Sequence, residues 1–547
     1  YQNLEPPFRS LFTQLAVFPG ETFSVEAVSA ITEQTLPSVK IGLGELVKNS
    51  LLLSVSPDRF LVHPLLRQFA QDHLQPEDAS DAQRKAAQFF LNLVIENSPP
   101  ISIENFHTLD ADLDNILGYL HWAEDAENLP IYIEYATCLV GQNLKGILPV
   151  RGLPVTKEIV KNALMTSVEL GNAEAEAFFR LQLGHLYLND TSSDTAETEI
   201  VKSLELAQKV NNEIAEAYAM LCLAQLERER PNYEYAVHHL EASLKKFSQR
   251  NDRRGVTATL FEIGFINANE GKFDEAARYF QEALMILEST PDIIEKAKLF
   301  HELGRIAARQ GKYDEAEKYL RDSLEINDSL GYQRWVARTL HQLGMLAMNK
   351  GQIDAAQSYY EKSLEINELL SDERGIAIIA QALGGIAYRQ GNLQKAESFF
   401  KRSLKINEEI GDERGLATNY KNLGDIYAAE NDFPMALIWY QKALETNEAT
   451  ENKYGIAIVT KAMGDVALQS GQYDIANHYY QKSLTLNKEM DSRSGEAYVL
   501  NGLGELAERQ GNIKFAIDCW QKSFALFEEL GSHMTEKLKN RLDKYIR

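Results

Sequence analysis

The sequence predicts an all-α superhelical solenoid of helix pairs about 40 residues long, preceded by a small three-helix unit with a β-wing. Three observations predict this class. A Leu-Gly signature recurs every 40 residues, and a second small residue follows it twelve residues later. The first 78 residues lack this repeat and contain two short strand-like runs. A strict period of this length indicates stacked repeats, each too small to bury its apolar face alone.

The segment 1–78 is expected to form the small N-terminal domain. FRSLFTQLAVFPG, FSVEAVSAIT and VKIGLGELVKNSLL predict three helices, with turns at Pro19-Gly20 and Pro37. LLLSVS and SPDRFLVHP predict two short strands joined through Pro57-Asp58, and LLRQFAQDHL predicts a closing helix. Three helices followed by a two-stranded wing form a winged-helix arrangement.

Charge argues against nucleic acid as the partner of this unit or of the whole chain. Residues 1–80 hold five basic residues against nine acidic ones, and the 547-residue chain has 56 Lys and Arg against 79 Asp and Glu, a net charge of −23. Affinity for DNA, RNA and anionic membranes comes from neutralising phosphate, so neither a nucleic acid nor a membrane is expected as partner. A DNA-binding regulator acting through the winged helix is the weakest of the alternatives kept open.

The cysteines and the hydropathy pattern point to the cytoplasm. Cys138, Cys222 and Cys519 lie far apart and form no CxxC pair, so neither a disulfide framework nor a zinc site is expected. No apolar run approaches the ~20 residues of a membrane helix. The sequence opens at a tyrosine without a signal peptide, which suggests a piece of a longer protein.

Residues 79–174 predict a helical connector with a degenerate helix pair at its end, and nine regular pairs are expected over 175–530. A C-terminal capping helix is expected over 531–547. The repeat glycines are Gly184, Gly264, Gly304, Gly344, Gly384, Gly424, Gly464 and Gly504, with Ala224 in the remaining place. The second small residues run from Ala196 to Ala516 at the same interval. These small side chains let the two helices of a pair approach closely.

One unit, residues 413–448, illustrates the residue pattern of the repeat. Its order Tyr420, Leu423-Gly424, Tyr427, Ala436 and Tyr440 resembles the tetratricopeptide repeat (TPR), with a period of 40 instead of 34 residues. The resemblance covers about two thirds of the chain. It implies a superhelix whose first helices line a concave partner-binding groove, although TPR arrays bind many unrelated partners.

The N-terminal part resembles a second family. LAVFPG, LVKNSLL and FLVHPLLRQFA look like the winged helix that follows the nucleotide-binding core of STAND-class signalling ATPases of the NB-ARC type. In that family the strand-to-helix His reaches the phosphate of bound ADP, which implies His63 as a nucleotide-state sensor in the full-length protein. Pro64 departs from the His-Asp pair of the plant motif, so only the His role carries over.

The connector extends this resemblance to bacterial STAND regulators through Asp112, Asp114, Asn115, Trp122 and Ala123. The family's ATPase needs a P-loop, G-x-x-x-x-G-K-[ST], and the sequence contains none. HExxH and GxSxG are also missing. The chain is therefore expected to be no enzyme and to hold no cofactor or metal, while ADP or ATP is expected for the full-length protein.

Candidate groove residues lie three before, one after and four after the repeat glycine, because helical periodicity places these positions on one face. Together with neighbours on the adjoining edge they are His301, Arg305, Arg309, Arg338, His341, Met345, Met348, Gln381, Tyr388, Arg389, Lys421, Asp425, Lys461, Asp465 and Asn501. The Arg and His residues suggest a grip on an acidic partner segment, over an apolar floor of Met345 and Met348.

Two readings compete with this hypothesis at residue level. Arg305 and Arg309 can pair with neighbouring Glu or Asp, and the Lys421–Asp425 and Lys461–Asp465 spacings are those of i,i+4 ion pairs. A further series on the second helices, from Asn327 to Asn487 at 40-residue intervals, is expected to serve stacking between units.

The sequence therefore predicts the regulatory and sensor portion of a STAND-type ATPase. By family resemblance, a protein, peptide or small inducer in the TPR groove would release the closed ADP state through the winged helix. An upstream nucleotide-binding domain would be the second partner, and release of the closed state would permit oligomerisation. Such a mechanism requires differential binding to two states. The alternative from another class is a free-standing TPR scaffold that binds partner peptides.

Overall fold

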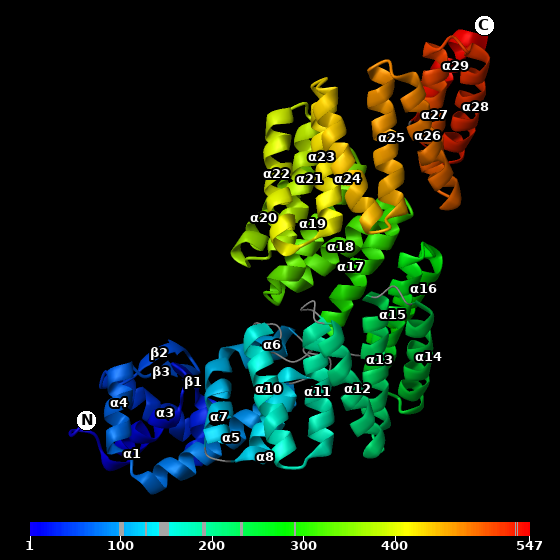
Figure 1. Cartoon of the computed structure of the whole chain (residues 1–547). Helices are drawn as coiled ribbons and strands as arrows, with labels where there is room; N and C mark the ends of the chain where they lie inside the picture. Colours follow the sequence, from blue (N-terminus) through cyan, green and yellow to red (C-terminus); the bar gives the residue numbers. More distant parts are fainter. Residues whose placement is uncertain are drawn as a thin grey trace. The chain divides into compact units, whose positions relative to one another are not determined.

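The computed structural model describes residues 1–97, 103–125, 128–141, 153–188, 193–229, 233–288, 292–530, 532 and 534–546. The sequence also predicts loops of the connector at Pro99-Pro100 and over 141–154, and these lie outside the described ranges except for residues 141, 153 and 154. Within them, no helix combines the length and apolar character that a bilayer crossing requires. The described elements are almost entirely helical, which confirms the all-α class (Figure 1).

The N-terminal unit packs four helices against a small antiparallel sheet. Its helices are α1 (Pro6–Gln14), α2 (Val25–Thr32), α3 (Leu36–Lys48) and α4 (Pro64–His73), with a short 3-10 turn at Leu15–Val17. Its strands are β1 (Thr22–Ser24), β2 (Leu53–Ser56) and β3 (Arg59–Leu61), in the order β1-β3-β2. This arrangement is consistent with the expected wing.

Two details of this unit differ from the sequence expectation. Thr22–Ser24 forms a third strand by pairing Phe23 with Phe60, a contact between residues far apart in sequence that local patterns do not reveal. Pro37 lies in the first turn of α3 and does not form a turn before it. Proline is tolerated there because its missing N–H would have no intrahelical acceptor.

The connector consists of α5 (Pro76–Asn97), α6 (Ile103–Ala111), α7 (Leu113–Asp125), α8 (Leu129–Val140) and α10 (Leu153–Glu169). Its motif residues fasten it to the N-terminal unit. Arg59 on β3 holds Asp112 with two bonds, Nη1 to Oδ2 at 3.0 Å and Nη2 to Oδ1 at 2.9 Å. Asn115 accepts from the Gly20 N–H and donates to the Thr22 carbonyl, both at 2.8 Å. The connector and this unit therefore pack as one body.

Nine helix pairs follow in the described residues. The first helices are α11 (Ala173–Leu188), α13 (Glu213–Glu229), α15 (Arg253–Asn269), α17 (Ile293–Arg309), α19 (Gln333–Asn349), α21 (Glu373–Arg389), α23 (Glu413–Ala429), α25 (Lys453–Gln469) and α27 (Arg493–Arg509). The second helices are α12 (Ser193–Lys209), α14 (Tyr233–Gln249), α16 (Phe273–Leu287), α18 (Tyr313–Ser329), α20 (Ile353–Leu369), α22 (Leu393–Ile410), α24 (Phe433–Ala449), α26 (Tyr473–Glu489) and α28 (Ile513–Glu529). The final helix, α29 (Met534–Ile546), packs on α28 through Leu538 and Leu542.

The repeat glycine is required by the ring that packs against it. A Cβ on Gly424 would lie 2.5 Å from the Tyr440 ring, and one on Gly464 would lie 2.8 Å from the Tyr480 ring. The pair is also tied by a serine of the second helix that donates to a carbonyl of the first, as Ser483 does to Ala457 at 2.7 Å.

The asparagine series lies at the joint between successive units, as expected for stacking. The side chain of Asn487 is buried and donates to the Ser483 carbonyl at 2.9 Å. Its oxygen would lie 1.8 Å from a Cβ on Gly495, at the start of the next repeat. The glycine of that next helix therefore makes room for the asparagine.

The chain divides into two compact units within the array, residues 1–332 and 333–547. The first holds the N-terminal unit, the connector and the pairs α11 to α18, and the second holds α19 to α29. The domain boundaries given from the sequence remain a prediction.

Candidate functional site

The predicted groove residues are distributed over both compact units. His301, Arg305 and Arg309 lie on α17 in the first unit, and the others lie on α19 to α27 in the second. His301 is buried, with 6% of its surface exposed, whereas Arg309 is exposed.

Arg305 is held by its own neighbours. Its guanidinium lies 2.7 Å from the buried Glu302 carboxylate and stacks over the Phe265 ring at 5.6 Å. Arg228 stacks on the same ring at 4.6 Å and pairs with Glu262 at 2.5 Å. The Arg228–Phe265–Arg305 stack therefore links three successive repeats. This geometry is the ion pair that competes with the groove hypothesis for Arg305. Arg228 and Phe265 stand four after Ala224 and one after Gly264, on the same helical grid, but in repeats before the first candidate, His301.

The charged pairs of the second unit are hydrogen-bonded in place. Lys421 Nζ lies 2.6 Å from Asp425, whose other oxygen accepts from the Tyr440 hydroxyl at 2.8 Å. Lys461, Asp465 and Tyr480 repeat this arrangement at 2.7 and 2.8 Å. Burial and the adjacent aspartate hold the pKa of both tyrosines well above the usual range. These groups support one another and leave little capacity for a ligand.

The remaining groove candidates are more open. Arg338 is exposed beside the Trp335 ring, at 5.3 Å, and Met345 is 38% exposed. His341 lies beside the Tyr360 ring, and Met348 is half-buried. Four further candidates remain. Gln381 and Tyr388 bond to the next repeat, at the Gly415 and Asp425 carbonyls, whereas Asn501 donates to Glu505 on its own helix and Arg389 is exposed.

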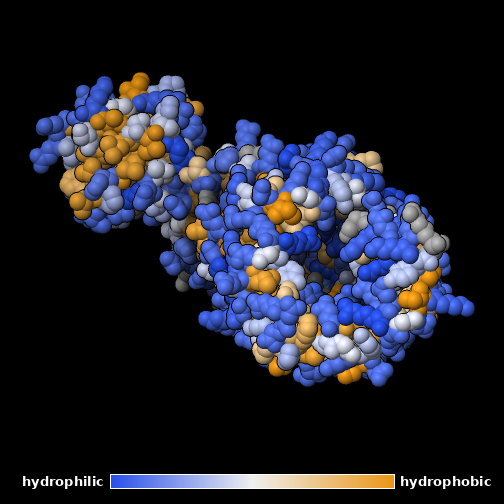
Figure 2. All heavy atoms as spheres, turned by 90° about the horizontal axis from the view of Figure 1, so that it is seen from above, coloured by the Kyte–Doolittle hydropathy of each residue, from blue (hydrophilic) through white to orange (hydrophobic). Residues whose placement is uncertain are grey.

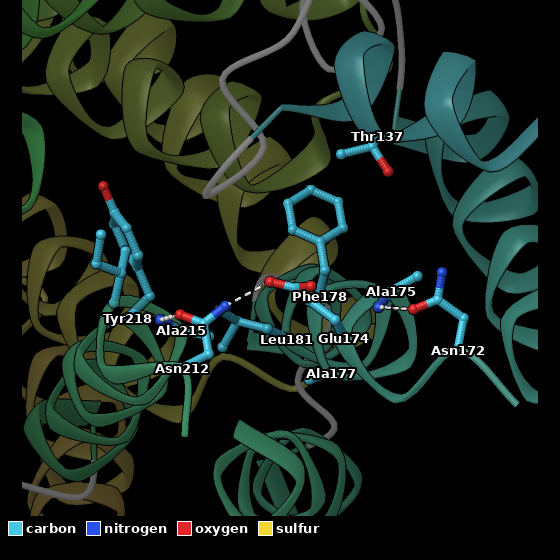
Figure 3. Close-up of a pocket in the computed structure, with 11 residues that line it drawn as sticks. Thr137, Asn172, Glu174, Ala175, Ala177, Phe178, Leu181, Asn212, Ala215 and Tyr218 are labelled. Atoms are coloured by element: carbon cyan, nitrogen blue, oxygen red, sulfur yellow. Dashed lines mark hydrogen bonds between the residues drawn. The ribbon is translucent and has the colours of Figure 1, made fainter. Parts of the chain in front are cut away.

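A pocket that sequence analysis did not find lies between α11 and α13 in the first unit (Figure 3). It has a volume of about 330 Å³ and is walled by Phe178, Leu181 and Tyr218, with Thr137 of α8 on its far side. Phe178 and Tyr218 occupy the position six before the repeat glycine or its alanine substitute. This position lies on the same helical face as those three before, one after and four after the repeat glycine, so helical periodicity alone would have indicated it.

A second pocket, of about 240 Å³, also lies between consecutive first helices, α25 and α27 of the second unit, and is lined in addition by Ser483 and Asn487 of α26. Ile458 and Tyr498 take the places of Phe178 and Tyr218, seven repeats further along. The cleft between consecutive first helices is thus a repeated feature of the array. Its chemistry differs between the two sites because the lining residues differ.

The N-terminal unit carries exposed apolar side chains on three of its elements. We call Leu36, Ile41, Leu53, Val55, Leu65 and Phe69, on α3, β2 and α4, the apolar surface. Leu65 is 76% exposed, and Figure 2 shows a broad apolar region on this unit. His63 caps α4 beside it: its Nδ1 accepts from the Leu65 N–H at 3.3 Å, and the ring is exposed.

The basic residues of the N-terminal unit are all engaged within the chain. The guanidinium of Arg67 donates to the Pro19 and Gly20 carbonyls, and Arg59 is bound by Asp112. Arg9 donates to the Leu4 and Gln2 carbonyls. Lys40 pairs with Asp58 and Lys48 with Glu45.

Comparison with known proteins identifies the repeats. Two models described as tetratricopeptide repeat match the array, one over 256–329, 335–409, 375–449 and 415–489 and the other over 461–519. The chain therefore carries tetratricopeptide repeats, behind a small helix-and-sheet unit. No curated protein matches the chain.

Solved structures are similar in fold. The crystal structure of a Signal Transduction ATPase with Numerous Domains (STAND) protein with a tetratricopeptide repeat sensor, from Pyrococcus horikoshii, is 16% identical with a TM-score of 0.50. The match covers 88% of this chain and 66% of that one. A Rap protein complexed with competence and sporulation factor is 15% identical with a TM-score of 0.51, over 65% of this chain and 99% of that one.

Proposed function

We propose that this chain is the regulatory and sensor portion of a STAND-type ATPase. The TPR array binds a protein, peptide or small inducer, and the N-terminal unit relays the event to a nucleotide-binding domain on the same polypeptide. One observation carries this proposal: the likeness to the STAND structure extends over 88% of the chain, which is more than the repeat array alone occupies. The partial coverage of that structure leaves room for a further domain.

The joint between connector and N-terminal unit supports a relay. The Arg59–Asp112 pair and the bonds of Asn115 to Gly20 and Thr22 fix α7 against the sheet. The Tyr119 hydroxyl adds a bond to the Val17 carbonyl at 2.9 Å. Because these contacts are buried or nearly so, a displacement of the connector carries the N-terminal unit with it.

The apolar surface is the proposed docking face for the nucleotide-binding domain. Large exposed apolar side chains on a small unit mark an interaction site, and a domain of the same polypeptide is the occupant that the STAND likeness supplies. This contact would be lost or rearranged when the protein passes from the closed to the active state. A ligand of the array would therefore activate the protein only if it binds the active state more tightly than the closed state.

His63 has the chemistry for a nucleotide sensor. Its Nδ1 accepts the Leu65 N–H, which places the ring proton of the neutral imidazole on Nε2, at the exposed edge. An exposed N–H donor fits a phosphate oxygen of ADP, and bound ADP would supply the charge that keeps the two domains closed. The phosphate cradle itself would come from the nucleotide-binding domain, because the chain has no P-loop.

Release of fluorescent ADP from the natural protein, carrying whatever domain precedes Tyr1, tests the proposal. His63→Ala removes a hydrogen bond to a charged group, which corresponds to roughly 10- to 150-fold faster release. His73→Ala on the same helix is the matched control and should release ADP at the unchanged rate. Equal release from both variants would overturn the sensor role. A natural protein that binds no nucleotide would favour the free-standing scaffold.

A further inference from the structure

The pocket between α11 and α13 presents a carboxylate that is held in position. Asn212 caps α13, its Oδ1 accepting the Ala215 N–H at 3.0 Å, and its Nδ2 donates to Glu174 Oε1 at 2.8 Å. Figure 3 shows this chain of bonds along the pocket floor. Glu174 is exposed, and in the described part of the chain this bond is the contact recorded for its carboxylate. Its second oxygen is therefore left to a ligand.

The other walls of this pocket suit a cation. The rings of Phe178 and Tyr218 form its sides, and aromatic faces attract ammonium and guanidinium groups. Burial and the neighbouring Asp252 hold the pKa of Tyr218 well above its usual range, so its ring stays neutral beside a ligand. Thr137 donates its hydroxyl hydrogen to the Ile133 carbonyl, so its oxygen can only accept from a ligand.

We propose that this pocket binds a basic side chain, arginine or lysine, of the partner segment held by the array. The inference rests on the proposed role of the array as a partner-binding sensor. A volume of about 330 Å³ is at the lower end of ligand pockets and fits one long side chain. The ammonium or guanidinium meets the free oxygen of Glu174, and its methylene stem lies against Phe178 and Leu181. The partner is thus basic at this position, whereas the Arg and His residues of α17 and α19 predicted an acidic segment further along the array.

The repeat-equivalent pocket between α25 and α27 is an internal control. Tyr454 stands where the first pocket has Glu174, and Lys461 stands where it has Leu181. The second pocket therefore contains the Lys461 amine and has no carboxylate at the position of Glu174. Both features make it unfavourable for a cation. The second pocket is also smaller, about 240 against 330 Å³, so the effect of charge alone is isolated by the Glu174→Gln variant.

A methyl-NMR titration of the full chain with two blocked tripeptides tests the proposal. One peptide is acetyl-Gly-Arg-Gly-amide, and the other replaces arginine with citrulline, which has nearly the same shape and no charge. The methyl groups of Ala175 and Ala215 report on the first pocket, and that of Ala457 reports on the second. We expect saturable shifts of Ala175 and Ala215 with the arginine peptide, at least about tenfold weaker binding of the citrulline peptide, and no shift of Ala457.

Two variants separate the carboxylate from general acidity. Glu174→Gln keeps the bond with Asn212 but removes the charge, and should weaken the arginine peptide about tenfold. Glu213→Gln, one residue beyond Asn212 and paired with Arg250, should leave binding unchanged. Equal binding of both peptides, full binding by Glu174→Gln, or shifts confined to Ala457 would overturn the proposal. None of these results bears on ADP release by the His63 variant, so the two proposals fail separately.

Discussion

Two adjacent glycines on α21 should respond in opposite ways to the same substitution. Gly384 is the repeat glycine, and a Cβ there would lie 2.6 Å from the buried Phe400 ring. Gly385 follows it, and a Cβ there meets no atom within 4 Å. Gly384→Ala therefore forces a ring of the second helix aside, whereas Gly385→Ala fills open space. Both changes share the same gain in helix propensity.

The magnitudes follow from these distances. Alanine in place of glycine within a helix stabilises by about 0.5–1 kcal/mol, and this gain stands alone in Gly385→Ala. Displacing the Phe400 ring, which is 3% exposed, costs about 1–3 kcal/mol as an overpacked core contact. Gly384→Ala is then destabilised relative to Gly385→Ala by about 1–3 kcal/mol.

Hydrogen exchange of the α21 amides is the appropriate assay, because stacked repeats open locally and a single melting curve averages over them. The expected difference in protection between the two variants is roughly 5- to 150-fold. Equal protection of Gly384→Ala and Gly385→Ala would refute the reasoning, since the packing of the ring on the repeat glycine would then contribute nothing.

Three other predictions concern single side chains. Arg305→Ala should lower the free energy of unfolding of the unliganded chain by about 1–3 kcal/mol, because it leaves the buried Glu302 carboxylate unpaired. Arg309→Ala, at an exposed position, should change it by less than about 0.5 kcal/mol. Equal effects of the two substitutions in urea unfolding would contradict this prediction. Asp112→Asn should cost about 1.5–3 kcal/mol by weakening the bond to Arg59, seen as an earlier urea midpoint, and an unchanged midpoint would argue against the fixed joint. Burial raises the pKa of the Cys222 thiol from 9.0 to about 12, so its contribution to stability is complete below pH 9 and is lost as the pH rises towards 12. Ellman's reagent at pH 8 should therefore label Cys222 only as fast as the protein opens; labelling proportional to reagent concentration would show an accessible thiol.

The repeat architecture could be predicted because one local pattern is enough to specify it. In the unit containing Gly424, the apolar spacing, the Asp432 turn and the first-turn Pro434 predict two helices, and α23 and α24 lie there. Packing within a pair depends on small residues at fixed positions, which a period makes visible. The strand at Thr22–Ser24 depends on pairing with residues about forty positions away, and no local pattern reveals it.

The candidate site was harder to predict, for a physical reason. Helical periodicity tells which face a residue lies on but not which neighbour neutralises it. Arg305 is on the expected face, yet Glu302 and Phe265 occupy its guanidinium. The pocket between α11 and α13 also needs Thr137 from the connector, which no repeat position indicates.

The measurement that tests the central claim most directly is hydrogen exchange of β2 and α4, the elements that carry much of the apolar surface. It compares residues 1–547 alone with the natural protein that includes the proposed nucleotide-binding domain. The account predicts that the amides of β2 and α4 become protected in the ADP-bound natural protein and that adding ATP or a partner of the array reverses this protection. Identical exchange in both proteins would contradict the account, because the N-terminal unit would then contact no domain to which it could relay a signal.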